Sequence, residues 1–171
     1  KVFAKSLLAN AKKIEHIHFI GHSAGSWAIS EAAKTIAKET DAEIHLTFLD
    51  SYVPLGWDEK ELGDFSNEPN TVYWAEQYFT RDPTLITTEV KLTNAHNVDI
   101  TPVNPGVKDH EFARYWYYAT VTGKFAEGER YEGEKLYYEA NDLEYGFARS
   151  LEASKENWLK SRKLEMGNSE A

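Results

Sequence analysis

Residues 17–26, Ile-His-Phe-Ile-Gly-His-Ser-Ala-Gly-Ser, decide the fold that we expect for this chain. An apolar run leads into a Gly-X-Ser-X-Gly turn, and a helical pattern follows at once. This order of strand, tight turn and helix presents a serine hydroxyl at the apex of a sharp bend, where it can act as a nucleophile. We expect Gly21 and Gly25 to supply clearance, because a side chain at either position would crowd the neighbouring strand or helix.

A helix and a second strand follow the turn. Small and apolar residues recur at helical spacing, at Gly25, Ala28, Ile29, Ala32, Ala33 and Ile36. Residues 44–49 form an apolar strand that ends in Asp50. A strand, helix, strand order with short loops predicts a parallel pair with a right-handed crossover. Ser23 and Asp50 should therefore lie at the carboxyl ends of neighbouring strands, on the edge where open α/β sheets place their active sites.

The other elements extend this unit into an α/β fold with a mostly parallel sheet and flanking helices. We expect helices at residues 2–12 and 112–121, and strands at 16–20, 72–80 and 89–92, the last extending to 95. Residues 51–70, rich in acids, proline and glycine, predict a long irregular loop. The core of this fold covers residues 1–122. Residues 123–171 form a C-terminal extension, with a hairpin-like stretch, a helix over 143–164 and a frayed end.

Composition narrows the function classes. The chain has 171 residues, 42% of them apolar and 27% charged, which suits one globular domain. Its net charge of −9 argues against a nucleic-acid partner, because phosphates would repel it. There is no cysteine, which excludes disulfides and thiolate metal sites. No apolar run is long enough to span a bilayer, and no signal peptide opens the chain, so the compartment stays open.

Acyl transfer by a serine needs a base, an acid that holds the base, and N–H donors for the oxyanion. The chain supplies Ser23, Asp50 and His110 in the order that this fold uses. The backbone N–H of Ala24 is the one oxyanion donor that the sequence assigns. This chemistry needs no metal and no organic cofactor.

Other residues compete for the same roles. We favour His110 as the base because it precedes the aromatic helix in a late loop that can fold over the edge. His96 is its rival, since it follows the predicted fourth strand. Asp82 and Asp99 are the rivals of Asp50, because each follows a later strand. The remaining histidines are expected to be structural: His16, His18, His22 and His45.

Gly-His-Ser-Ala-Gly at 21–25, followed by Phe-Leu-Asp at 48–50, resembles the α/β-hydrolase lipases of the pancreatic lipase type. In that family the acid follows the strand after the nucleophile, so the resemblance implies Asp50 as the acid. Residues 95–106 are similar to a structural segment of the family. The family's catalytic histidine is followed by arginine and aromatic residues, as His110 is here by Arg114, Tyr115, Tyr117 and Tyr118. The resemblance covers about residues 14–121.

The resemblance implies an extracellular, lipase-like serine esterase acting on a small-molecule or lipid ester. The family's disulfides are absent, and Ser51 stands where the family has proline. The strands that precede the nucleophile are also missing, so we expect the C-terminal part of a larger hydrolase, completed by an N-terminal segment or chain. Two other functions stay open. One is a catalytically inactive binding module on this scaffold, and the other is amide or thioester hydrolysis by the same triad.

Overall fold

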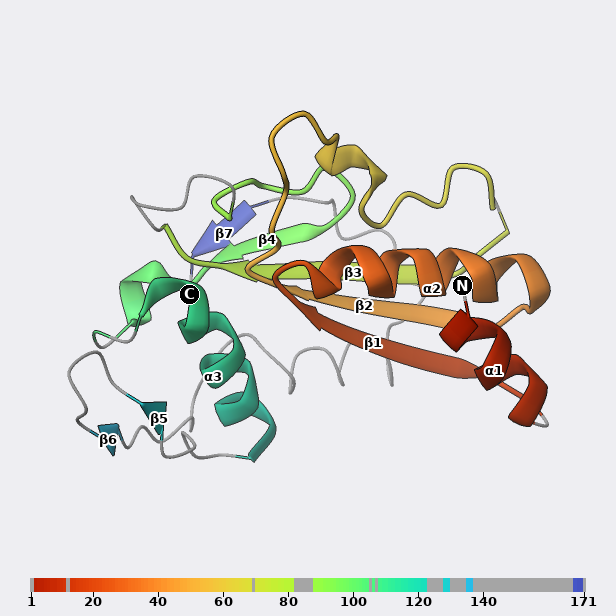
Figure 1. The fold of residues 1–171 in the computed structure, drawn as a ribbon, viewed down its shortest axis with the longest axis horizontal. Coiled ribbons are helices and arrows are strands. Elements are labelled where there is room, and N and C mark those ends of the chain that lie inside the picture. The colour runs from red at the N-terminus through yellow and green to blue at the C-terminus, as the bar shows by residue number, and fades with distance from the viewer. Residues whose placement is uncertain are drawn as a thin grey trace.

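The computed structural model describes residues 2–11, 13–68, 70–81, 88–104, 106, 108–122, 128–129, 135–136 and 168–170. Its centre is a five-stranded sheet in the order β1-β2-β3-β4-β7, in which every neighbouring pair is parallel (Figure 1). The strands are β1 (His16–His22), β2 (Glu43–Leu49), β3 (Tyr73–Phe79), β4 (His96–Asp99) and β7 (Asn168–Glu170). The predicted α/β class, with a parallel sheet and flanking helices, is confirmed.

Successive side chains along a strand point to opposite faces of the sheet. Ile44, Leu46 and Phe48 of β2 pack in one cluster, together with buried residues of α2 (Gly25–Glu39). The residues between them belong to the opposite face, which α3 (Asp109–Thr122) covers with Trp116 and other apolar side chains. The helix α1 (Val2–Asn10) contacts α2, and Figure 1 shows it near the start of β1. Each strand therefore sends its odd and even side chains to different helices.

The predicted strand at residues 89–92 is wrong, because the fourth strand is β4, at His96–Asp99. Residues 89–92 form a loop whose backbone is held by amide side chains. Asn97 accepts from the Leu92 N–H at 2.8 Å and donates to its carbonyl at 2.9 Å. Gln77 donates to the Val90 carbonyl at 2.9 Å. Side-chain hydrogen bonds thus take the place of a strand ladder, while Leu92 is still buried.

The loop after β2 contains one short 3-10 helix, η1 (Glu59–Glu61), and a second, η2 (Thr101–Val103), follows β4. After α3, β5 (Gly128–Glu129) and β6 (Lys135–Leu136) form an antiparallel pair in the region expected to be hairpin-like. The terminal helix expected over 143–164 lies outside the described residues. Within the end predicted to be frayed, Asn168–Glu170 form β7, which pairs with β4 at the edge of the sheet. Among the described residues, no helix has the length and apolar character needed to cross a membrane.

Candidate functional site

Ser23 stands in the tight turn between β1 and α2. Its φ of 55° lies in the left-handed region, where a side chain is strained and persists only if its surroundings hold it. Two backbone hydrogen bonds do so: the Ser23 N–H donates to the Leu49 carbonyl at 2.9 Å, and the Ser26 N–H donates to the Ser23 carbonyl at 3.1 Å. The turn is therefore fastened both to the end of β2 and to the first turn of α2.

The two glycines of the motif do not have the same role. A Cβ at Gly21 would lie 2.9 Å from the Gly25 carbonyl oxygen and 3.0 Å from Cδ1 of Ile29, closer than real contacts allow. A Cβ at Gly25 would meet nothing within 4 Å. The expectation that both glycines supply clearance is thus wrong for Gly25, because as the first residue of α2 it points its missing side chain into open space.

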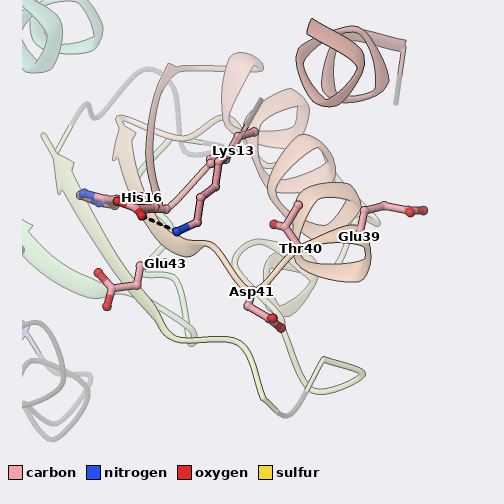
Figure 2. Close-up of a pocket in the computed structure, with 8 residues that line it drawn as sticks. Lys13, His16, Glu39, Thr40, Asp41 and Glu43 are labelled. Atoms are coloured by element: carbon pink, nitrogen blue, oxygen red, sulfur yellow. Dashed lines mark hydrogen bonds and ion pairs between the residues drawn. The ribbon is translucent and has the colours of Figure 1, made fainter. Parts of the chain in front are cut away.

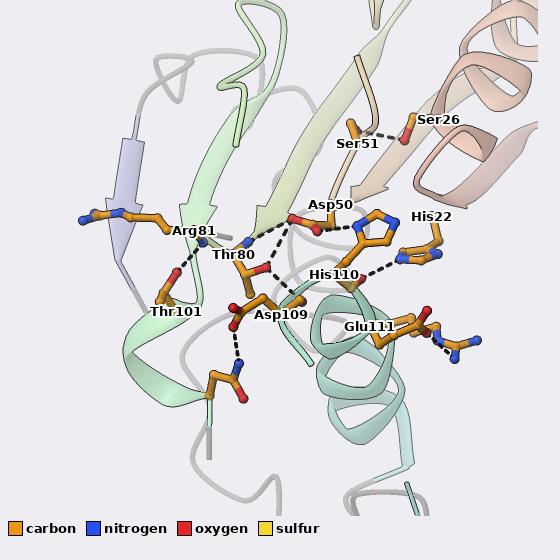
Figure 3. Close-up of polar contacts among 12 residues, drawn as sticks. His22, Ser26, Asp50, Ser51, Thr80, Arg81, Thr101, Asp109, His110 and Glu111 are labelled. Carbon is orange, nitrogen blue, oxygen red and sulfur yellow. Dashed lines mark hydrogen bonds and ion pairs between the residues drawn. The ribbon is translucent and has the colours of Figure 1, made fainter. Parts of the chain in front are cut away.

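Asp50 follows β2 directly and also has a positive φ, of 46°. Its side chain is fully buried, and its carboxylate accepts two good hydrogen bonds (Figure 3): from His110 Nδ1 at 2.7 Å and from the Thr80 N–H at 3.0 Å. Burial raises the pKa of Asp50 above its ordinary value, although the hydrogen bonds from His110 and Thr80 act in the opposite direction. The carboxylate is thus held at the carboxyl edge of the sheet, against the histidine that the sequence predicts.

His110 lies within the first turn of α3, not in the loop before the helix as predicted. The helix begins earlier because Asp109 is fastened at its start: the Thr80 hydroxyl donates to the Asp109 carbonyl at 2.9 Å, and Asn104 donates to the Asp109 carboxylate at 2.8 Å. The hydrogen bond to Asp50 places a proton on Nδ1 of His110 and leaves a lone pair on Nε2. Its side chain is 18% exposed, so the ring is reachable from solvent.

The histidine lies beside the serine turn. His22, the residue before Ser23, has its ring centroid 4.6 Å from that of His110. Ser23 Oγ and His110 Nε2 form no hydrogen bond in this structure, and catalytic hydrogen bonds are often long before substrate binds. The Ala24 N–H, predicted as an oxyanion donor, donates to no acceptor among the described residues. The three residues predicted for a Ser-His-Asp site therefore lie toward one edge of the sheet, without a hydrogen bond between Ser23 and His110.

Two further contacts fasten the serine turn to the acid loop. The Ser51 hydroxyl donates to the Ser26 hydroxyl at 2.9 Å, and both side chains are fully buried (Figure 3). At the next residue of α2, the Trp27 indole N–H donates to the Tyr52 carbonyl at 2.8 Å. Sequence reasoning assigned no role to Ser26 or Ser51, although each stands directly beside a residue singled out for the site.

Asp99 and Asp82 were the rivals for the role of the acid, and His96 was the rival for the role of the base. Asp99 pairs with Arg81 at 2.5 Å and accepts from the Thr101 N–H at 2.9 Å. His96 opens β4 instead of following a strand, and it pairs in register with Glu76 in the middle of β3, short of the edge where Asp50 lies. Its ring centroid is 6.0 Å from that of Trp74. Asp82 lies outside the described residues.

One buried cluster has the residue types of a metal site. Ligand atoms of His18, His45 and Glu76 lie within 4.8 Å of one another on neighbouring strands. The same atoms already form a hydrogen-bonded chain: His18 Nε2 lies 2.8 Å from Thr47 Oγ1, which donates to Glu76 Oε1 at 2.8 Å, and His45 Nε2 lies 3.2 Å from that oxygen. Burial lowers the pKa of His18 to about 3, so it is neutral. These hydrogen bonds engage the same nitrogen and oxygen atoms that a metal would use.

Two cavities in the described part of the chain have none of Ser23, Asp50 and His110 in their lining. One of about 860 Å³ is lined by His16 and Glu43, the first residues of β1 and β2, and so opens at the edge opposite Asp50 (Figure 2). A second, of about 560 Å³, is an apolar groove beside α2, lined by Phe3, Phe19, Trp27, Ala28, Ile29, Glu31, Ala32, Trp57 and Glu61. In the loop after β2, Val53 is in the core, whereas Leu55 is 84% exposed and Trp57 lines this groove.

Comparisons with known proteins add no relative. No protein-family model matches the chain, and neither a curated protein nor a solved structure gives a match. The geometry of the site is therefore the ground for assigning a function.

Proposed function

We propose that the chain is a serine hydrolase of the α/β-hydrolase class that cleaves carboxylic esters. Ser23 is the nucleophile, His110 the general base and Asp50 the acid that holds it. The observation that carries this proposal is the 2.7 Å hydrogen bond between His110 Nδ1 and Asp50, beside a serine held in a left-handed turn. A buried Asp–His pair next to such a serine is the arrangement that serine nucleophiles require.

The reaction follows from the protonation states. As Ser23 Oγ attacks the ester carbonyl carbon, His110 Nε2 takes the hydroxyl proton and the carbonyl oxygen becomes an oxyanion. The carbon–oxygen bond to the alcohol then breaks, and His110 returns the proton to the departing alkoxide. Water attacks the resulting acyl-serine ester by the same route and releases the carboxylic acid. Asp50 stays ionised throughout and stabilises the imidazolium that forms twice in the cycle.

The start of α2 supports stabilisation of the oxyanion. The Ala24 N–H follows the nucleophile directly, and the N-terminus of a 15-residue helix carries a partial positive charge. Because this N–H donates to no other acceptor among the described residues, it is available to the developing charge. Removing one such donor costs on the order of 10² to 10³ in kcat.

The apolar groove favours an ester with an apolar acyl chain. Trp27 lies one helical turn after Ser23, and its ring meets that of Trp57 edge-on, with centroids 4.6 Å apart. Trp57 is 57% exposed, although burying an aromatic ring of this size is favourable. Such a surface, beside the helix that follows the nucleophile, suits a hydrocarbon chain better than a charged group.

The test is covalent labelling of the full chain with a fluorophosphonate probe. We expect the wild type to be labelled and Ser23→Ala to be unlabelled, because the probe reacts with an activated serine. Ser66→Ala, at an exposed serine in the loop after β2, is the matched control and should label like the wild type. Absence of labelling in a folded wild type would reject the esterase and leave the inactive binding module.

A further inference from the structure

We propose that His22 is a positioning residue for the catalytic base: its ring packs at a tilt against His110 and its Nε2–H donates to the His110 backbone carbonyl. This inference rests on the proposed function, because it assigns His22 to the machinery around His110. Figure 3 shows the two rings side by side at the carboxyl edge of the sheet.

The strand explains why His22 reaches α3. His22 is the last residue of β1 and pairs in register with Leu49, which is buried in the cluster beneath α3. Paired residues on neighbouring strands point to the same side of a sheet, so His22 also points to the α3 side. His18, four residues earlier and therefore of the same parity, stacks on His45 on that face, with ring centroids 3.8 Å apart.

The hydrogen bond acts on the backbone of the residue that carries the base. His22 Nε2 lies 2.8 Å from the His110 carbonyl oxygen. A carbonyl only accepts, so Nε2 carries the proton. Within a helix that carbonyl already accepts from the N–H four residues on, and the bond from His22 uses its second lone pair. The first turn of α3 is thus fixed to the end of β1, directly before Ser23.

His22 is suited to this role because it stays neutral. Burial lowers its pKa below the ordinary value of 6.5, although the hydrogen bond to the His110 carbonyl acts in the opposite direction. A charged ring 4.6 Å away would oppose the imidazolium that His110 must become when it takes the serine proton. A neutral ring packs against His110 without that repulsion.

Two substitutions separate the ring from the hydrogen bond. His22→Phe keeps a flat ring and removes the donor, whereas His22→Gln keeps an N–H donor and removes the ring. With p-nitrophenyl butyrate as substrate, we expect kcat to fall about 10-fold in His22→Phe with KM unchanged, and to recover to within about threefold of wild type in His22→Gln. His16→Gln, at the far end of the same strand, is the control and should keep the wild-type kcat.

A second measurement does not depend on turnover. In protein labelled with 15N-histidine, we expect the Nδ1 proton that His110 donates to Asp50 to exchange with water about 10-fold faster in His22→Phe than in wild type or His22→Gln. Unchanged exchange and an unchanged kcat in folded His22→Phe would overturn the proposal. If His22→Phe does not fold, His22→Leu, which also lacks the donor, takes its place. A wild type without turnover or labelling would reject the esterase alone, since the exchange rates would still test His22.

Discussion

Asp50→Asn tests the acid most directly, because the substitution changes the chemistry at almost constant shape. In the wild type the Thr80 N–H donates to one carboxylate oxygen at 3.0 Å, and His110 donates to the other at 2.7 Å. The Thr80 N–H can only donate, so the asparagine carbonyl oxygen must stay with it. The amide NH2 then faces His110 Nδ1 and requires an acceptor there. The ring is driven into the tautomer with its proton on Nε2, which cannot accept a proton from Ser23.

The expected loss in kcat is about 10⁴-fold, or about 5.5 kcal/mol of transition-state stabilisation, the size associated with a base held in the wrong tautomer. The protein should stay folded, because asparagine fills the same volume and burial already disfavours the charged form of Asp50. A pure positioning defect would be smaller, since one neutral hydrogen bond contributes about 1 kcal/mol. The magnitude therefore separates a tautomer effect from a packing effect.

The assay measures kcat for p-nitrophenyl butyrate and the rate of fluorophosphonate labelling, with thermal unfolding as the check on folding. Asp99→Asn is the matched control, because Asp99 is also a buried aspartate at a strand end but pairs with Arg81. It should keep kcat within about threefold of wild type. Folded Asp50→Asn with more than about a tenth of the wild-type kcat would refute the reasoning. A large loss in Asp82→Asn instead would assign the acid to Asp82.

Three further predictions concern stability, each measured by urea unfolding. Ser51→Ala and Ser26→Ala should each lower the free energy of unfolding by about 1–3 kcal/mol, because each leaves one buried hydroxyl unpaired. The double variant should lose less than the sum of the two single losses. Gly21→Ala should cost about 1–3 kcal/mol because its methyl group would press on the Gly25 carbonyl, whereas Gly25→Ala should be neutral or slightly stabilising. His18 takes up its proton near pH 6.5 in the unfolded chain but only near pH 3 in the folded chain. The free energy of unfolding of the wild type should therefore fall as the pH drops from 6.5 to 3. His18 contributes at most about 1.4 kcal/mol per pH unit to this fall. His18→Gln should show a shallower fall; equal slopes in the two proteins would contradict the assignment.

The local order of elements was readable from the sequence because short-range periodicity determines it. The helix over Gly25–Glu39 and the strands on either side of it appear where their apolar spacing indicates. Ser23 has the strained, left-handed backbone conformation that a nucleophile turn requires, and the hydrogen bond from its N–H to the Leu49 carbonyl stabilises that conformation. Gly25 shows the limit of this reasoning, because a motif glycine can be free of any steric demand.

The strand predicted at residues 89–92 was wrong because side chains, and not a neighbouring strand, form the hydrogen bonds to this backbone. Val90 and Leu92 alternate like a strand, yet Gln77 and Asn97 cap their carbonyls and the loop never joins the sheet. His22 was expected only to pack. His22 and His18 are four residues apart in β1, so their side chains point to the same face of the sheet, the face that α3 covers. The sequence does not indicate which residue of α3 His22 contacts.

Neighbours a few residues apart in the chain dictate the strand, turn and helix around Ser23, the parallel pair that follows, and hence the edge of the sheet where Asp50 lies. Only the tertiary structure shows that His110, which the sequence favoured over His96, is hydrogen-bonded to Asp50, that Asp99 pairs with Arg81, and that His22 packs against His110. These pairings join residues up to 88 positions apart. They depend on where α3 packs, and that is set by the summed burial of many side chains on one face of the sheet rather than by any local pattern.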